Sequence, residues 1–248
     1  MWSGRERLRR AFWQFARPVK KRLVRAARSP RAGKTDWGGL RSLDPISHSF
    51  GFDRGTPIDR YYIESFLASH SDDIRGHAME VADKTYTDRY GGGRVTRSDV
   101  IHNTAGNPRA TMVLDLSNSR NASDCLFDCI ICTQTLHLIF DVRAAVDTLY
   151  RLLNPGGVLL MTVPGISQVS RADMQTTGDF WRFTDASVRC LLTGPFPDSE
   201  CEVRAYGNIV SSIAFLHGIA AEELKEEELD TRDADFQLLL TARAVKPA

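Results

Sequence analysis

The sequence predicts an α/β fold, a mainly parallel sheet with helices on both faces, preceded by a basic N-terminal extension. Short unbroken apolar runs, typical of buried parallel strands, alternate with segments whose apolar residues recur at helical spacing. Several of these runs end on an acidic residue, and residues 128–164 contain a complete strand, helix and strand. The 248 residues are enough for one such domain of roughly 200 residues and an extension.

The stretch 128–164 is the clearest of these units. Residues 129–132 are uniformly apolar, as expected of a strand buried on both faces. Apolar residues then recur every three or four positions over 142–153, which predicts a helix with Asp141 as its N-cap.

A tight turn is predicted to end this helix. Pro155 cannot continue a helix, and Gly156 can adopt a positive φ. The chain should therefore reverse into a second apolar strand at 158–163.

Three further strands are predicted before this unit, each with an acid at its carboxyl end. They are 77–81 with Glu80, 94–98 followed by Asp99, and 110–114 followed by Asp115. Open parallel sheets bind ligands outside the carboxyl ends of their strands, so the three acids predict one crevice that suits a nucleoside. Taken singly, each acid would be a solvated or helix-capping residue, and the prediction depends on their spacing.

The remaining elements are predicted after residue 164. They are a helix at 185–192, strands six and seven at 201–206 and 236–244, and between these an apolar helix at 209–221 and an acidic stretch at 222–230. The strands complete a seven-stranded sheet, and the acidic stretch is interpreted as a solvated face.

Residues around the second strand of the 128–164 unit resemble a known family. A strand ending in Phe-Asp, a polar loop, a helix closing on Arg-x-Leu-x-Pro-Gly-Gly and a strand ending near Pro are similar to the region of strands four and five in class I S-adenosylmethionine-dependent methyltransferases. The matching residues are Phe127, Asp128, Arg151, Leu153, Pro155, Gly156 and Gly157. The resemblance covers roughly residues 74–246 and implies a Rossmann-like, doubly wound sheet that binds S-adenosylmethionine.

The resemblance also implies the residues that contact the cofactor. Asp99 matches the acid that accepts hydrogen bonds from the ribose hydroxyls, and Asp115 with Leu116 matches the position beside the adenine. Glu80 matches the acid that helps to place the amino acid moiety. The loop after strand four contributes Thr133 and Gln134.

The first cofactor loop departs from the family. Ala82 and Thr85 stand where the family has glycines, which let the backbone approach the cofactor. Side chains of Asp83, Thr85 or Tyr86 would supply new contacts, or binding is lost; both alternatives stay open. The connection 101–109 is also too short for the usual helix.

The acceptor side is predicted at 165–184. Its string from Asp179 to Thr184 is similar to one in bacterial methyltransferases that act on cell-surface sugars and related small molecules. Trp181 and Phe180 would stack on a sugar face, Arg182 would hold a carboxylate or phosphate, and Asp179 joins them as a substrate contact. Alternatively, Phe183 and Trp181 are core residues that anchor the loop.

His137 is the candidate base, because O-methylation removes a hydroxyl proton and histidine titrates in the useful range. The alternative is a histidine packed at the start of a helix. The sequence thus predicts an O-methyltransferase that acts on a sugar, a glycolipid precursor or another small hydroxyl compound. The competing hypothesis is an inactive binding or assembly module of the same fold near membrane glycosyltransferases.

The charge of the chain is divided unevenly. Residues 1–34 contain 12 Lys and Arg and one acid, which leaves 20 basic and 30 acidic residues in the rest. Their pattern predicts a basic amphipathic helix that contacts a membrane peripherally. A disordered tail or a helix docked on the acidic domain is the alternative, and nucleic acid is disfavoured because the basic excess stops there. Residues 35–73 are predicted as a linker and helix before a domain at 74–248.

Five cysteines, an odd number, lie mostly in predicted strands, which favours a reducing compartment. Cys129 and Cys132 should face opposite sides of one strand, so no metal site is predicted. The sequence has no apolar run long enough for a transmembrane helix and no secretory signal. A cytoplasmic protein, peripheral to the inner membrane face, is therefore expected.

Overall fold

The computed structural model describes residues 38–118 and 124–248. The chain forms two units, Met1–Asp44 and Pro45–Ala248. In the first, the described residues include the short 3-10 helix η1 (Gly38–Arg41). The amphipathic helix predicted within residues 1–34 lies outside the described residues. Everything below concerns the second unit.

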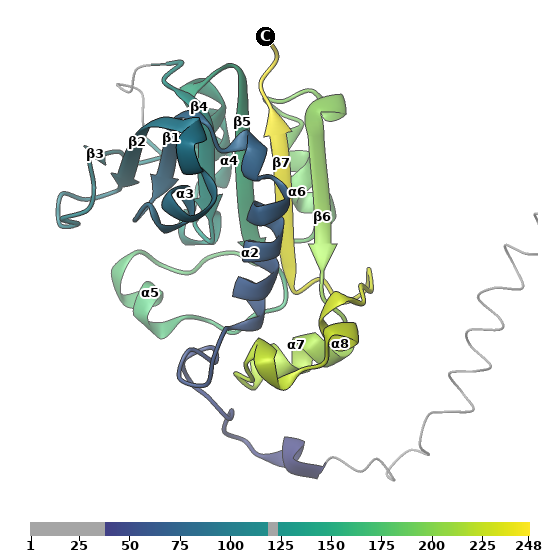
Figure 1. Cartoon of the computed structure of the whole chain (residues 1–248). Coiled ribbons are helices and arrows are strands. Elements are labelled where there is room, and N and C mark those ends of the chain that lie inside the picture. Colours follow the sequence, from purple (N-terminus) through teal and green to yellow (C-terminus); the bar gives the residue numbers. More distant parts are fainter. Residues whose placement is uncertain (1–37, 119–123) are drawn as a thin grey trace, which may run out of the picture. The chain divides into compact units, whose positions relative to one another are not determined.

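The unit is built on a seven-stranded sheet with the order β3-β2-β1-β4-β5-β7-β6 (Figure 1). Strand β7 is antiparallel to both of its neighbours, and the other pairs are parallel. The strands are β1 (Gly76–Val81), β2 (Val95–His102), β3 (Met112–Val113), β4 (Phe127–Thr133), β5 (Leu153–Pro164), β6 (Cys201–Tyr206) and β7 (Leu239–Val245). The predicted fold class is confirmed.

Seven α-helices of the described residues accompany the sheet. They are α2 (Ile58–Ser69), α3 (Thr85–Tyr90), α4 (Val142–Leu152), α5 (Arg171–Thr176), α6 (Asp185–Leu192), α7 (Ile209–Leu216) and α8 (Glu226–Asp230). Between β2 and β3 there is no helix among the described residues, as the short connection predicted. No described helix has the length and hydropathy needed to span a bilayer.

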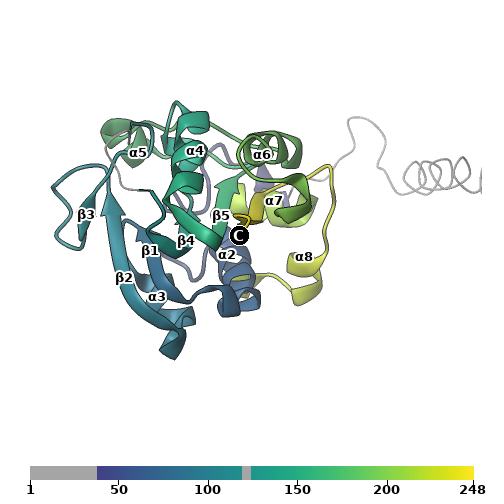
Figure 2. The same cartoon turned by 90° about the horizontal axis from the view of Figure 1, so that it is seen from above.

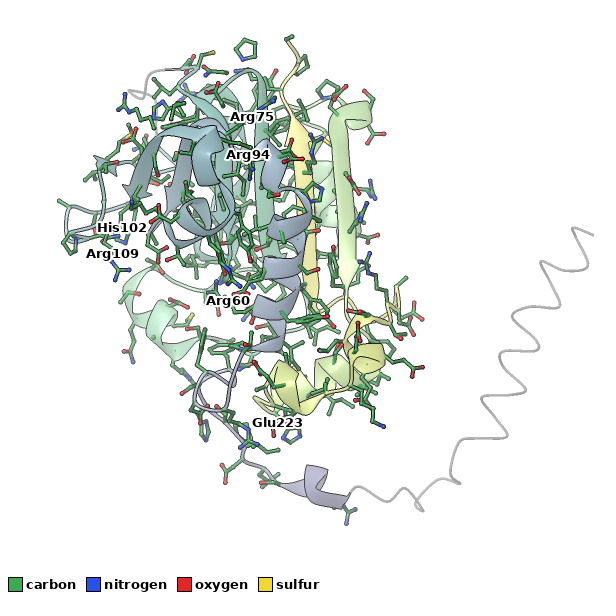
Figure 3. The ribbon with its side chains drawn as sticks, in the orientation of Figure 1. Arg60, Arg75, Arg94, His102, Arg109 and Glu223 are labelled. Atoms are coloured by element: carbon green, nitrogen blue, oxygen red, sulfur yellow. The ribbon has the colours of Figure 1, made fainter. Side chains whose placement is uncertain are left out.

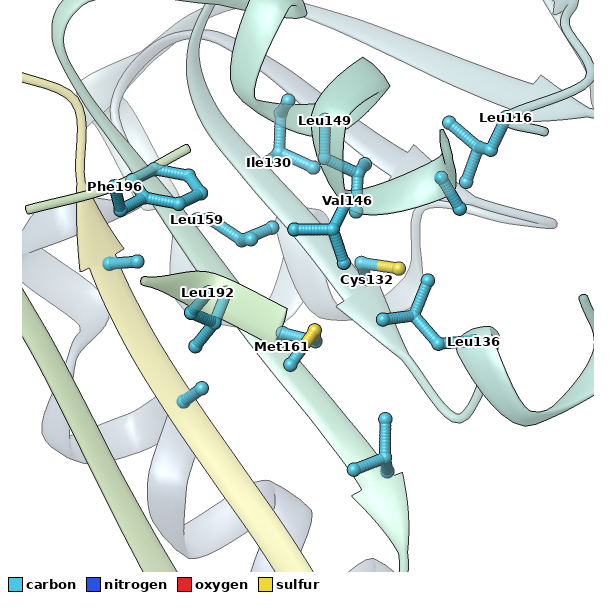
Figure 4. Packing of buried hydrophobic residues seen from close by; sticks show 14 of the residues in the cluster. Leu116, Ile130, Cys132, Leu136, Val146, Leu149, Leu159, Met161, Leu192 and Phe196 are labelled. Atoms are coloured by element: carbon cyan, nitrogen blue, oxygen red, sulfur yellow. The ribbon is translucent and has the colours of Figure 1, made fainter. Parts of the chain in front are cut away.

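Helices α4 and α6 cover one face of the sheet (Figure 2). The Asp141 carboxylate caps α4 by accepting a hydrogen bond from the Ala144 amide at 3.1 Å, as predicted. Helical spacing then places Val146 and Leu149 against the sheet, where they are fully buried (Figure 4). This packing fixes the loop that leaves β4.

Helices α2, α3, α7 and α8 bury side chains in a second cluster on the opposite face. Phe66 of α2 and Cys129 of β4 belong to this cluster, whereas Cys132 belongs to the first. The two cysteines therefore face opposite sides of the strand, as predicted. Because α2 packs on the sheet, the compact unit begins at Pro45 and not at residue 74.

Several strand ends differ from the predictions, most of all those of β2 and β5. Strand β2 runs to His102, three residues past Asp99, because Val100 and Ile101 are apolar and buried on the sheet. Strand β5 begins at Leu153, and the expected turn lies inside it, with Gly156 at a φ of +75°. The Pro-Gly-Gly turn is held by the Gly156 amide, which donates to the Lys246 carbonyl at 2.8 Å.

Candidate active site

The carboxyl ends of β1 to β4 open into one cavity of about 890 Å³. Its wall includes Glu80 from β1, His102 from β2, and Thr133 from β4. Asp115 and Leu116, which follow β3, also line it. The crevice predicted from the ends of the strands is therefore present, at the position where open parallel sheets hold their ligands.

Glu80 binds the first loop of this cavity through hydrogen bonds to its backbone and side chains. Its buried carboxylate accepts hydrogen bonds from the amides of Tyr86 and Thr87, at 3.1 and 2.7 Å, and from the Thr87 hydroxyl at 2.8 Å. These bonds satisfy free amides at the start of α3. Burial raises the pKa of Glu80 to about 7, and the three bonds oppose this rise without cancelling it.

Ala82 holds a glycine-like backbone at the position where the family has glycine. Its φ is +73°, in the left-handed region, and the residue belongs to the cavity wall. The Ala82 amide donates to the Ile101 carbonyl at 2.9 Å, and its carbonyl accepts from the Asn107 side chain at 2.7 Å. The loop thus keeps a backbone conformation that glycine favours, although the residue is alanine.

The other loop residues predicted to contact the cofactor also line the cavity. Asp83, Thr85 and Tyr86 belong to its wall, and the Asp83 carboxylate accepts a hydrogen bond from the Thr85 backbone amide at 2.9 Å. Arg109 lies 3.7 Å from the Asp83 carboxylate. Figure 3 shows Arg109 and His102 on the β2–β3 side of the unit.

Arg60, in the first turn of α2, lines the cavity and was not predicted from the sequence (Figure 3). It donates a hydrogen bond to the Tyr86 hydroxyl at 2.7 Å. The preceding Asp59 accepts a bond from the Gln134 amide nitrogen at 3.1 Å. A basic residue at the start of the N-terminal helix was the only signal, and the sequence alone does not show that this helix faces the crevice.

Gln134 lies directly after β4 with a φ of +45°. Its amide donates to the Thr162 carbonyl at 2.9 Å. Its side-chain oxygen is buried and has no hydrogen-bond partner among the described residues. Thr133 and Gln134 therefore lie in the cavity wall as predicted, and Gln134 presents an acceptor that a ligand donor could satisfy.

Asp99 does not line the cavity, which corrects its predicted role at the ribose. It is 7% exposed and accepts hydrogen bonds from His77 at 2.6 Å and Thr111 at 2.7 Å. Burial acts to raise the pKa of Asp99, but these bonds and the charge of Arg97 hold it below its usual value. His102 and Asn103 occupy the cavity wall at the end of β2 instead.

Asp115 and Leu116, which the resemblance places beside the adenine, line the cavity. Leu116 is buried and forms an apolar part of the wall. The Asp115 carboxylate accepts hydrogen bonds from the amide and the hydroxyl of Ser117, at 2.9 and 2.7 Å. Both bonds go to one oxygen, Oδ1, of this exposed carboxylate.

Part of the cavity wall is aromatic. Phe140 and Phe180 belong to its wall with exposed fractions of 70% and 48%, and their ring centroids are 5.5 Å apart in an edge-to-face arrangement. Trp181, predicted to bind substrate, lies outside the wall. Its indole nitrogen donates to the carbonyls of Ile139 and Phe140, at 3.1 and 3.2 Å, so it supports Phe140 from behind.

Asp179 and Arg182 form an internal clamp, which corrects their predicted role as substrate contacts. Two Arg182 nitrogens donate to the two Asp179 oxygens at 2.6 and 3.0 Å, and a third donates to the Ser167 carbonyl at 3.2 Å. The hydrogen bond from Arg182 is the main reason that the pKa of Asp179 is lowered. This pair therefore fastens the loop, a role that the sequence had suggested only for Phe183 and Trp181.

His137 is also not placed as a base. It is buried, lies outside the cavity wall, and its Nδ1 has no hydrogen-bond partner among the described residues. Burial lowers the pKa of His137 to about 4, although the nearby Asp179 acts in the opposite direction. A neutral packed histidine, the alternative reading of the sequence, is what the structure contains.

The rim of the cavity is a segment fastened to the acidic stretch. The Thr56 amide and hydroxyl donate to the Glu222 carboxylate, at 2.9 and 2.6 Å, and Arg54 pairs with Glu223. The Ala221 amide donates a hydrogen bond to the Thr56 carbonyl at 2.8 Å. The stretch predicted as a solvated face therefore anchors the rim before α2.

Comparison with known proteins agrees with this architecture. Residues 45–194, more than half of the chain, match the family model described as a methyltransferase domain. The probable polyketide synthase 10 of Dictyostelium discoideum is 33% identical over 77 residues, which are 31% of this chain but only 3% of that protein.

Two solved structures share the fold. The [4+2]-cyclase SpnF has a TM-score of 0.51 at 14% identity, over 79% of this chain and 85% of its own. A SAM-dependent methyltransferase from Archaeoglobus fulgidus has a TM-score of 0.50 at 8% identity, over 75% of this chain and 94% of its own. At these identities the likeness concerns the fold.

The residues present fit the cofactor of such domains. Ala82 has the left-handed backbone conformation that glycine favours in the first loop, and Asp115 and Leu116 suit a nucleoside. The side-chain oxygen of Gln134 has no hydrogen-bond partner among the described residues and could accept a bond from a ligand. The fit lacks only an acid at the end of β2. The chain therefore belongs to the family of S-adenosylmethionine-dependent methyltransferase domains.

Proposed function

We propose that the protein transfers a methyl group to an oxygen atom of a small acceptor that contacts the aromatic side chains of the cavity wall. The observation that carries this proposal is the mixed lining of the cavity. Its wall includes charged side chains, among them Arg60, Glu80 and Asp115, and the exposed rings of Phe52, Phe140 and Phe180. Charged groups suit a nucleoside derivative, and aromatic rings suit an apolar acceptor.

Polar and charged residues of the cavity wall would hold the cofactor. Asp115 would accept from the nucleoside, Leu116 would contact its base, and the Arg60 guanidinium would bind the amino acid carboxylate. When bound, S-adenosylmethionine supplies an electrophilic methyl carbon. The protein then acts mainly by alignment, because a fixed cavity holds the reacting atoms within reach of each other.

The acceptor predicted from the sequence is a sugar or glycolipid hydroxyl compound. In the structure it would contact other residues than those predicted. Phe140 and Phe180 provide the exposed rings that Trp181 was expected to provide. Aromatic faces suit the apolar faces of sugars as well as planar molecules. The proposal therefore keeps an oxygen acceptor and assigns its binding to these two rings.

Methyl transfer can be tested with methyl-labelled S-adenosylmethionine and a small-molecule extract. We expect label in the small-molecule fraction with the whole chain, and at least tenfold less with Asp115→Ala. The matched control is Asp72→Ala, because Asp72 is exposed and outside the cavity. Equal labelling by the two variants, or no label at all, would contradict the proposal.

The competing function is a binding module without catalysis. It is favoured by Ala82, which stands in the cavity wall where the family has glycine, and by His102 and Asn103 where the family has an acid. Such a module would bind cofactor weakly or not at all and would transfer no label. Calorimetry with S-adenosylmethionine separates it from the enzyme.

We further propose, on charge alone, that residues 1–34 bring the chain to an anionic membrane surface. Co-sedimentation with anionic vesicles should be strong for the whole chain and weak for a chain without these residues. Equal sedimentation of both would refute this.

A further inference from the structure

Arg60 differs from the other described arginine of the cavity wall in the group that holds it. Arg89 forms an ion pair with the Glu64 carboxylate at 2.8 Å, so a negative charge balances its own. Arg60 instead donates a hydrogen bond from Nη1 to the hydroxyl of Tyr86 at 2.7 Å. Among the residues that the structure describes, no carboxylate forms an ion pair with Arg60. A hydroxyl therefore orients this guanidinium, where a carboxylate would also neutralise it.

The Tyr86 phenol stays neutral near neutral pH. Burial raises the pKa of Tyr86 above its ordinary value of 10.0, and the positive charge of Arg60 opposes this rise without cancelling it. Burial acts to lower the pKa of Arg60, but its interactions with Tyr86 and the nearby Asp59 raise it above its ordinary value. The pair is thus a neutral acceptor and a charged guanidinium. A guanidinium in this state can bind an anion, and its planar fork suits a carboxylate.

The Tyr86 hydroxyl is itself held in place by the first cofactor loop. Tyr86 is 7% exposed, and its ring is stacked with that of Tyr90, with the ring centroids 6.3 Å apart. Its backbone amide donates to the buried Glu80 carboxylate at 3.1 Å. Because both the ring and the backbone of Tyr86 are fixed, its hydroxyl is a rigid acceptor for a long side chain that comes from another element, α2.

The start of α2 is fixed on a second side. The Asp59 carboxylate accepts a hydrogen bond from the Gln134 side chain at 3.1 Å, and Ile58 is fully buried. Gln134 follows β4 and Tyr86 follows β1, so two consecutive residues of α2 join the loops of two neighbouring strands. The backbone that carries Arg60 is therefore held, and the orientation of its guanidinium depends on the bond to Tyr86.

We propose, resting on the proposed function, that Tyr86 positions Arg60 for the carboxylate of the cofactor's amino acid moiety. Without the hydroxyl, the arginine side chain would sample several rotamers and would have to be immobilised when the cofactor binds. Immobilising one such side chain weakens a complex by roughly three- to tenfold. Tyr86 thereby couples the order of the first loop to the binding of the charged end of the cofactor.

The test compares S-adenosylhomocysteine with methylthioadenosine, which has the same nucleoside and sulfur but no amino acid moiety. In calorimetry with the whole chain, Tyr86→Phe should weaken S-adenosylhomocysteine by about three- to tenfold and methylthioadenosine less than twofold. Arg60→Ala should weaken only S-adenosylhomocysteine, by at least tenfold, and adding Tyr86→Phe to it should cause no further loss. The matched control is Tyr90→Phe, which removes the same hydroxyl outside the cavity wall and should leave both affinities within twofold of wild type.

Three results would overturn the inference. An unchanged affinity of Tyr86→Phe for S-adenosylhomocysteine would show that the hydroxyl does not prepare Arg60. An equal loss for both ligands would show that it only holds the loop, and a further loss on top of Arg60→Ala would show that Tyr86 does not act through Arg60.

The inference and the proposed function fail in different ways. Each of the three results leaves methyl transfer standing, whereas the predicted binding pattern without any methyl transfer would refute the proposed function alone. A wild-type chain that does not bind S-adenosylhomocysteine would refute both.

Discussion

Replacing Ala82 with glycine should stabilise the protein and strengthen cofactor binding. At a φ of +73°, the alanine side chain costs about 1–2 kcal/mol relative to an ordinary backbone conformation. Glycine removes that cost but adds about 0.4–1 kcal/mol of entropy to the unfolded chain. The net gain is about 0.5–1 kcal/mol, which corresponds to a rise of roughly 2 °C in Tm for a domain of this size.

The assay is urea unfolding of Ala82→Gly beside Ala172→Gly, which makes the same chemical change in helix α5. Ala172 is exposed within that helix, so glycine there should cost about 0.5–1 kcal/mol. Affinity for S-adenosylmethionine should rise only in Ala82→Gly, because only Ala82 belongs to the cavity wall. If both variants lose stability equally, the left-handed conformation at Ala82 is wrong.

Three further variants test individual residues. Asp179→Asn should lower the free energy of unfolding in urea by about 3 kcal/mol, because it leaves Arg182 without its bidentate partner. The affinity for the cofactor should not change. A loss of affinity would show that Asp179 contacts the ligand. The pKa of Glu80 is raised from 4.5 to about 7 in the folded protein, so folding between these pH values takes up a proton at Glu80. The contribution of protonated Glu80 to the free energy of unfolding is therefore fully present below pH 4.5 and is lost as the pH rises to 7. The stability of wild type relative to Glu80→Gln should therefore fall across that range by up to roughly 3 kcal/mol, and a constant difference would contradict the raised pKa. Glu222→Ala should speed proteolytic cleavage within 51–57 because it frees Thr56, whereas Glu227→Ala on α8 should not; equal rates would show that the rim is held otherwise.

Local signals predicted the framework of the fold well. Helix α4 could be placed because its cap and its apolar spacing lie within a few residues, and the following turn because only glycine takes the required φ easily. The end of β2 could not be placed in this way. The charged Asp99 suggested that the strand ends there, but the apolar Val100 and Ile101 continue it.

The candidate site was predicted only in part, because its details depend on contacts between distant residues. The bond between His77 and Asp99 joins neighbouring strands, and the position of Arg60 depends on how α2 packs over the sheet. The residues from 179 to 182 were recognised, but which of them face the cavity is decided by the fold of the loop. Asp179 and Arg182 turned inward, and Phe180 did not.

Calorimetric titration of S-adenosylmethionine into the whole chain, Asp115→Ala and Asp99→Ala tests the central claim most directly. The structure predicts one binding site per chain, weakened at least tenfold by Asp115→Ala, whose residue lines the cavity. Asp99→Ala, once its fold is verified by circular dichroism, should bind within about twofold of wild type, because Asp99 is held by His77 and Thr111. No binding at millimolar cofactor, or an equal loss in both variants, would contradict the assignment of this cavity as the cofactor site.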